Sequence, residues 1–273
     1  MNFLKINDIF SIVNKCIENN KPFSHIRFGD GGLKFIDAIL NENRVLLTKI
    51  CKKEGLPKSK VLEIFELWGY YARMADCIDT PEVYYNKTFW PRIKKFGKPI
   101  NPETDKLMRS WEYLYNQSEF DNNTFCNPES NCLFILKRYK KINLFDVMEN
   151  RKICIITAKP EVKNVLKNYN VDIVEIVGQW QNHYENSFDK VITFLSNNSN
   201  KYDLFLISAG ELGRIYTGYI KDNGGRALDL GFVAEYWVNG YLHPRFYPYI
   251  KQNEKNKLEL KLTDKGKVYD QFI

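Results

Sequence analysis

The 273-residue sequence lacks the long apolar runs that membrane and secreted proteins need. None approaches the ~18 residues of a membrane span, and the longest, near Val171–Gly178 and Leu204–Ala209, have the length of strands. The N-terminal segment carries Lys5 and Asp8 within its apolar part. This pattern excludes a secretory signal and indicates a short amphipathic helix. We therefore expect a cytoplasmic protein without a membrane span.

Cysteine and histidine are also sparse and unpatterned. The six cysteines include no C-x-x-C pair and have no His at zinc spacing, and none of the three histidines begins an H-E-x-x-H motif. These patterns argue against a disulfide framework and against the common zinc sites, so the thiols are expected to be reduced.

The excess of positive charge is small, with 40 Lys and Arg against 33 Asp and Glu. Lysines are concentrated at the C-terminus, but acidic residues such as Glu254, Glu259 and Asp264 are interleaved with them. This mixture favours a solvated surface over a nucleic-acid tract, and we expect no nucleic-acid partner. A mildly basic protein suits an anionic small molecule such as a nucleotide.

The second half of the sequence alternates between strand-like and helix-like segments. Compact apolar runs predict strands at Lys152–Thr157, Val171–Val177, Leu204–Ser208 and Arg226–Leu230. The segments between them predict three helices: one that begins near Pro160, one over 186–197 and one over 212–220. This alternation is typical of βαβ units and a parallel sheet.

The first half is more helical. The sequence predicts a strand at His25–Phe28, followed by a glycine-rich turn at Gly29–Gly32 and a helix at Leu33–Leu40. Two further helices are predicted at Val61–Ala75 and Glu103–Asn116. We expect one α/β domain over residues 1–273, with a mostly parallel sheet flanked by helices. A helical and aromatic insertion is expected at about 45–120, and irregular chain at 241–250.

Four predicted strand ends carry turns of unusual composition. In parallel sheets, ligands bind at the carboxyl ends of strands. The third turn in chain order follows the predicted strand at Leu204–Ser208 and contains Ser208, Ala209, Gly210, Glu211, Gly213 and Arg214. Its backbone N–H groups, helix N-terminus and arginine could hold a phosphate. In the alternative interpretation it is an ordinary turn, with Ser208 as the helix N-cap.

The first turn surrounds Asp30 with Gly29, Gly31 and Gly32, and Arg27 lies three residues before Asp30. Asp30 could bind a metal or a sugar hydroxyl or act as a base, and Arg27 could bind phosphate. A structural Arg–Asp pair is the alternative.

The two remaining turns carry Lys159 and Asp229. The L-D-x-G sequence around Asp229 also matches part of a methyltransferase motif, but the further glycine of that motif is absent.

The segment FSHIRFGDGG and the later segment from SAGELGR to RALDLG together resemble the GT-D-type glycosyltransferase family, first catalogued as a domain of unknown function. The resemblance implies a Rossmann-like enzyme that moves a sugar from a nucleoside-diphosphate sugar, such as a uridine one, to a glycan or glycoprotein acceptor. The matching positions are Arg27, Asp30 and Gly31 in the first motif, Ser208, Gly210 and Gly213 in the donor-diphosphate turn, and Asp229 and Gly231 at the last strand end.

The resemblance and the turn chemistry suggest a role for each candidate residue. Arg27, Arg214, Lys159 and helix-terminal N–H groups would stabilise the leaving diphosphate. Asp30 or Glu211 would act as the base toward the acceptor hydroxyl.

The chain departs from the family pattern at two positions. The family has Glu where this chain has Gly32, and tends to have His where it has Phe232. Both changes remove potential metal ligands, so we predict no metal ligands and no cofactor, with fixed positive charge in place of Mn²⁺ or Mg²⁺. A non-catalytic nucleotide- or glycan-binding remnant is the alternative to an active transferase.

Overall fold

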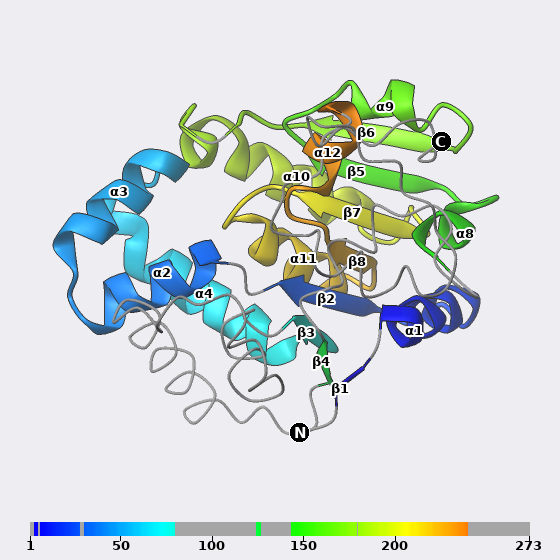
Figure 1. Ribbon diagram of the computed structural model, residues 1–273, viewed down its shortest axis with the longest axis horizontal. Coiled ribbons are helices and arrows are strands. Elements are labelled where there is room, and N and C mark those ends of the chain that lie inside the picture. Colours follow the sequence, from blue (N-terminus) through cyan, green and yellow to red (C-terminus); the bar gives the residue numbers. More distant parts are fainter. Residues whose placement is uncertain are drawn as a thin grey trace, which may run out of the picture.

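The computed structural model describes residues 3–4, 6–27, 30–79, 124–126, 143–178 and 180–239. The described strands form one sheet in the order β1-β4-β3-β2-β8-β7-β5-β6, and every pairing between them is parallel (Figure 1). The strands are β1 (Phe3–Leu4), β2 (Phe23–Arg27), β3 (Cys77–Asp79), β4 (Thr124–Cys126), β5 (Ile153–Thr157), β6 (Val171–Glu175), β7 (Leu204–Ser208) and β8 (Arg226–Asp229). The predicted α/β class with a mostly parallel sheet is therefore confirmed.

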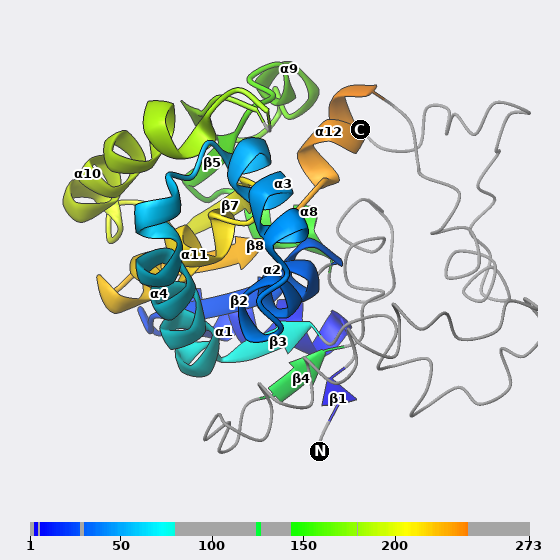
Figure 2. The same ribbon diagram turned by 90° about the vertical axis from the view of Figure 1, so that its left-hand side faces the viewer.

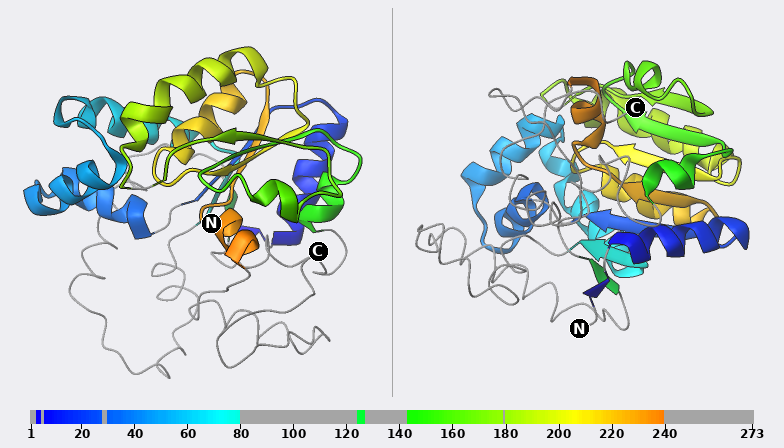
Figure 3. Two further views of the ribbon diagram at one scale, coloured as in Figure 1. Left: turned by 90° about the horizontal axis from the view of Figure 1, so that it is seen from above. Right: turned by 45° about the vertical axis from the view of Figure 1, so that its right-hand side comes forward.

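Helices cover both faces of this sheet, as Figures 2 and 3 show. One face packs against α1 (Ile6–Glu18), α8 (Leu144–Met148), α9 (Val162–Val165) and α12 (Val233–Asn239). The other packs against α2 (Asp30–Leu40), α3 (Arg44–Glu54), α4 (Val61–Met74), α10 (Asp189–Asn198) and α11 (Gly213–Asp222). A 3-10 turn at Lys58–Lys60 precedes α4, and a π-helical turn at Tyr184–Phe188 leads into α10. No described helix has the length and apolarity to span a bilayer.

The central strands explain why the sequence there is continuously apolar. In β5, Ile153 and Ile155 face the first helix layer, whereas Cys154 and Ile156 face the second. Side chains alternate between the faces of a strand, and here both faces are buried under helices.

The structure differs from the prediction in the first half of the chain. Residues 30–32 form the first turn of α2 instead of a separate glycine-rich turn, so this helix begins three residues before its predicted start at Leu33. Strand β3 was not predicted, although it pairs with β2 in the main sheet. The predicted helix at 103–116 and the irregular segment at 241–250 lie outside the described residues.

Helices α4 and α11 approach each other closely at a glycine. A Cβ atom on Gly218 would lie 2.2 Å from Cγ of Tyr71, whose side chain is buried. Real Cβ atoms do not approach other atoms so closely, and Tyr71 cannot retreat within a packed core. Gly218 therefore sets the separation of the two helices.

Substitution of Gly218 by Ala should destabilise the fold by about 1–3 kcal/mol, because the added methyl group overpacks this helix contact. Gly69→Ala in α4 is the matched control, since its new Cβ would meet only the Arg73 guanidinium, at 3.9 Å. That variant should be neutral or more stable by up to about 1 kcal/mol, from helix propensity. Urea unfolding measures both changes, and equal stabilities of the two variants would contradict this packing argument.

Candidate functional site

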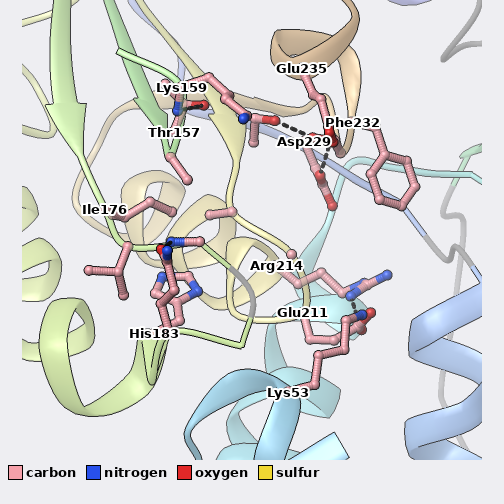
Figure 4. Close-up of a pocket in the computed structure, with 18 of the residues that line it drawn as sticks. Lys53, Thr157, Lys159, Ile176, His183, Glu211, Arg214, Asp229, Phe232 and Glu235 are labelled. Carbon is pink, nitrogen blue, oxygen red and sulfur yellow. Dashed lines mark hydrogen bonds and ion pairs between the residues drawn. The ribbon is translucent and has the colours of Figure 1, made fainter. Parts of the chain in front are cut away.

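A cavity of about 490 Å³ lies at the carboxyl ends of β2, β5, β6, β7 and β8 (Figure 4). Parallel strands end at one edge of a sheet, so turns far apart in the sequence meet there. The predicted site residues that line the cavity are Arg27, Lys159, Ser208, Ala209, Gly210, Glu211, Arg214 and Asp229. The structure thus brings at least one residue from each of the four predicted turns to one space.

Gly231 lines the cavity as well, whereas Gly32 and Gly213 do not. Gly213 begins α11, and its missing side chain allows close packing, because a Cβ there would lie 3.1 Å from Cγ2 of Ile207. Asp30 and Gly31 are placed by their backbone in the first turn of α2. Gly29 lies outside the described residues.

Arg27, the last residue of β2, is buried with 7% of its surface exposed. Its Nε lies 3.5 Å from Oδ2 of Asp79, the residue opposite it in β3. The other carboxylate oxygen of Asp79 lies 2.8 Å from Nε2 of His25. Asp79, which the sequence analysis did not single out, therefore balances the charge of Arg27 and ties it to the sheet.

Arg214, in the first turn of α11, is also buried, with 4% of its surface exposed. Its Nε donates a hydrogen bond of 2.5 Å to the backbone oxygen of Arg27, and its Nη1 pairs with Oε2 of Glu211. The guanidinium also lies over the ring of Trp68, 5.4 Å from the ring centroid. These contacts hold the two arginines next to each other.

The environment of Glu211, a residue of the cavity, changes the acidity of its carboxyl group. Burial raises the pKa of its carboxyl group above the ordinary 4.5, and the nearby carboxylates of Glu54 and Asp229 raise it further. Arg214 and Lys53 oppose this change. A carboxylate with a raised pKa is a stronger proton acceptor than an ordinary surface glutamate.

The turn after β8 has a backbone shape that only glycine adopts easily. Gly231 has φ +57°, and a Cβ on it would lie 1.5 Å from Nη1 of Arg27. Its backbone N–H donates to Oδ1 of Asp229 at 3.0 Å, and its carbonyl oxygen accepts from the hydroxyl of Ser208. The interpretation of Ser208 as a helix N-cap is wrong, because Leu212 precedes α11 and Ser208 bonds this turn instead.

Three buried polar side chains that the sequence did not single out, His183, Tyr216 and Glu54, lie in contact at or beside the cavity. Nε2 of His183, a cavity residue, lies 3.2 Å from the hydroxyl of Tyr216, and its Nδ1 lies 3.8 Å from the Glu54 carboxylate. Both carboxylate oxygens of Glu54 are buried without a hydrogen-bond partner. The loop that carries His183 is tied to α3, because Trp180 donates its backbone N–H to the Lys53 carbonyl oxygen at 2.7 Å.

The Arg214 guanidinium, which is positively charged, lies beside Gly32. A Cβ on Gly32 would lie 3.0 Å from Nη2 of Arg214 and 3.1 Å from Trp68. A glutamate at this position, which the resemblance implies, would therefore extend into space that these two side chains fill. Among the residues that the structure describes, no group of three or more His, Cys, Asp or Glu side chains is arranged to hold a metal ion.

Comparisons with known proteins identify the fold. Residues 107–237 match the model of the GT-D-like family, a GT-D fold-like domain. A solved structure of domain of unknown function 1792 (DUF1792) is 15% identical, with a TM-score of 0.55 over 100% of this chain and 90% of that chain. A second, reported to show that this highly conserved domain has a distinct glycosyltransferase fold, is 15% identical, with a TM-score of 0.54 over 100% and 88%.

A third structure, described as a new glycosyltransferase (DUF1792) from Streptococcus sanguinis, is 14% identical, with a TM-score of 0.54 over 100% of this chain and 93% of that chain. No curated protein sequence matches the chain significantly. Residues 107–237 therefore resemble a GT-D-like domain, and the chain has the fold of the DUF1792 structures, one of which is reported as a distinct glycosyltransferase fold.

Proposed function

We propose that the protein transfers a sugar from a nucleoside-diphosphate sugar to a hydroxyl group of a glycan or glycoprotein acceptor. The observation that carries this proposal is the pair of buried guanidinium groups, Arg27 and Arg214, at the cavity of a glycosyltransferase fold. Such a cavity suits a ligand that carries a diphosphate group better than a neutral ligand. A uridine nucleotide is the donor that we would test first.

Departure of the diphosphate requires stabilisation of its growing negative charge. Arg27 and Arg214 would supply this charge from positions fixed by their buried partners, and Lys159 would add a third cation. Gly210, with φ +59°, leaves the backbone after β7 open to close approach by a phosphate oxygen. Because the two guanidinium groups are held in place before the donor binds, little reorganisation is needed during transfer.

The acceptor hydroxyl must lose a proton as it attacks the sugar. Glu211 is our first candidate for the base, because it lines the cavity and its pKa is raised by burial. Asp30, at the start of α2, is the second candidate.

A non-catalytic binding protein is the alternative, favoured by Gly32 and by Phe232, a half-exposed side chain at the cavity. The deciding experiment incubates the protein with a panel of sugar nucleotides, with and without glycan acceptors, and measures the free nucleoside diphosphate released. Release that depends on the protein supports a transferase. Tight nucleotide binding without release would support the alternative. No binding of any nucleoside diphosphate in calorimetry would contradict the transferase and leave only a glycan-binding protein.

Gly231→Ala should weaken binding of the nucleoside diphosphate by about tenfold or more, because the new methyl group would displace the Arg27 guanidinium. Gly224→Ala is the matched control. Gly224 also has a positive φ, +80°, but a Cβ there would meet nothing within 4 Å. Both variants carry similar backbone strain, so equal affinities in calorimetry would show that Arg27 does not bind the ligand.

Removal of divalent metal should leave the affinity for a uridine nucleotide unchanged, because Arg214 already places positive charge beside Gly32. Calorimetric titration in excess chelator, repeated with added Mn²⁺, measures the difference. An affinity gain of about tenfold on adding Mn²⁺, worth about 1.4 kcal/mol, would show that other residues of the chain bind the ion.

The rate of transfer should fall on the acid side with a midpoint above pH 4.5, because protonation of Glu211 removes the base and burial raises its pKa. Glu211→Gln should lose most of the activity at every pH. Glu235→Gln is the control, since Glu235 lines the same cavity but is exposed. Profiles of kcat/KM against pH test this assignment, and an unchanged acid limb in Glu211→Gln would refute it.

A further inference from the structure

A second hollow, of about 370 Å³, adjoins the cavity at the carboxyl end of β6. It lies between this strand end and the π-helical turn that leads into α10. The residues that line both spaces are Ala158, Ile176, Val177, Gly178 and Gln181. Because five residues are shared, an extended ligand can occupy both spaces at once.

Two of the residues at the junction between the two spaces, Ala158 and Gly178, are small. A Cβ on Gly178 would lie 3.2 Å from Oε1 of Gln181 and 3.8 Å from the methyl group of Ala158. The Gln181 amide is held in place, because its Oε1 accepts a hydrogen bond of 2.8 Å from the Gly178 backbone N–H. The Gln181 side chain therefore has a fixed position at this junction.

The two spaces differ in charge. The first contains four cationic side chains, Arg27, Lys53, Lys159 and Arg214, against three acidic ones. The second contains one of each sign, Lys190 and Glu175. A diphosphate is therefore favoured in the first space, and a neutral but polar group in the second.

The second hollow also presents hydrogen-bonding groups beside apolar walls. Glu175 is exposed, and no partner for its carboxylate occurs among the described residues. The Asn186 amide donates to the Gln181 carbonyl oxygen at 2.9 Å, which leaves its own oxygen open. Val174 and Val191 provide apolar surface. Carboxylate oxygens accept from vicinal hydroxyls, and apolar walls suit the face of a planar ring.

We propose that this hollow binds the nucleoside of the donor, with the Glu175 carboxylate accepting hydrogen bonds from the ribose hydroxyls. The proposal rests on the proposed function, because it requires the diphosphate of the donor to occupy the first cavity. Glu175 ends β6 next to Thr157, its register partner at the end of β5. In doubly wound sheets, an acidic residue at a neighbouring strand end can bind ribose in this way.

The test separates the nucleoside from the diphosphate. The affinities of three ligands are measured: the nucleoside diphosphate that binds the wild type most tightly, its 2′-deoxy analogue and inorganic pyrophosphate. Each ligand is titrated into the wild type, Glu175→Ala, Glu175→Gln and Glu66→Ala. Glu66 is the matched control, an exposed glutamate on α4 that lines neither space.

Glu175→Ala should weaken binding of the nucleoside diphosphate by about tenfold or more, with a smaller loss for Glu175→Gln. Pyrophosphate should bind both variants and Glu66→Ala as it binds the wild type. The 2′-deoxy analogue should lose affinity on the wild type but little more on Glu175→Ala, since the two changes remove the same contact.

An unchanged affinity for the nucleoside diphosphate in Glu175→Ala would overturn the proposal and leave the proposed function standing. An equal loss of affinity for pyrophosphate would also overturn it. If no nucleoside diphosphate binds the wild type, the proposed function itself fails.

Discussion

The burial of two guanidinium groups at one edge of the sheet is the constraint on which the candidate site depends. A buried charge is costly unless it is paired and hydrogen-bonded, so each arginine requires partners within the fold. Arg27 has Asp79 from the neighbouring strand, and Arg214 has Glu211 and the backbone oxygen of Arg27. The last contact links α11 directly to the end of β2. The charge of the cavity is thus built into the packing of the sheet and its helix layer.

Glycines in the predicted turns make room for these arginines. Gly231 faces Nη1 of Arg27, and Gly32 faces Nη2 of Arg214, each so closely that a side chain would collide with or crowd the guanidinium. Glycine-rich turns at strand ends usually suggest that the backbone approaches a phosphate. Here two of the glycines admit a cation of the protein itself, which would in turn hold the phosphate. The same sequence pattern therefore serves anion binding through side chains as well as through backbone.

The sequence predicts the parts of the structure that depend on local patterns. The strands and helices of the second half follow from apolar runs buried on both faces, and Arg27, Glu211 and Arg214 meet because parallel strands end at one edge. Asp79 was missed because its strand has three residues and its partners are distant in sequence. The contact between Glu54 and His183 likewise joins separate elements and leaves no local pattern. The start of α2 at Asp30 was missed because glycines there favour a turn over a helix.

Gly32 stands where the resemblance to the GT-D-type family implies a glutamate, and this difference bears on how the site can supply positive charge. A glutamate ligand contributes through the divalent ion that it binds, whereas Arg214 next to Gly32 carries its charge covalently. A guanidinium can also donate two parallel hydrogen bonds to a phosphate group, which fixes the orientation of the leaving group. The neighbouring Glu211 offsets part of this charge when it is ionised, and less when it accepts a proton. Uptake of the acceptor proton by Glu211 would therefore strengthen the field of Arg214 on the diphosphate as that group departs, so that acid–base and electrostatic catalysis would reinforce each other in one ion pair.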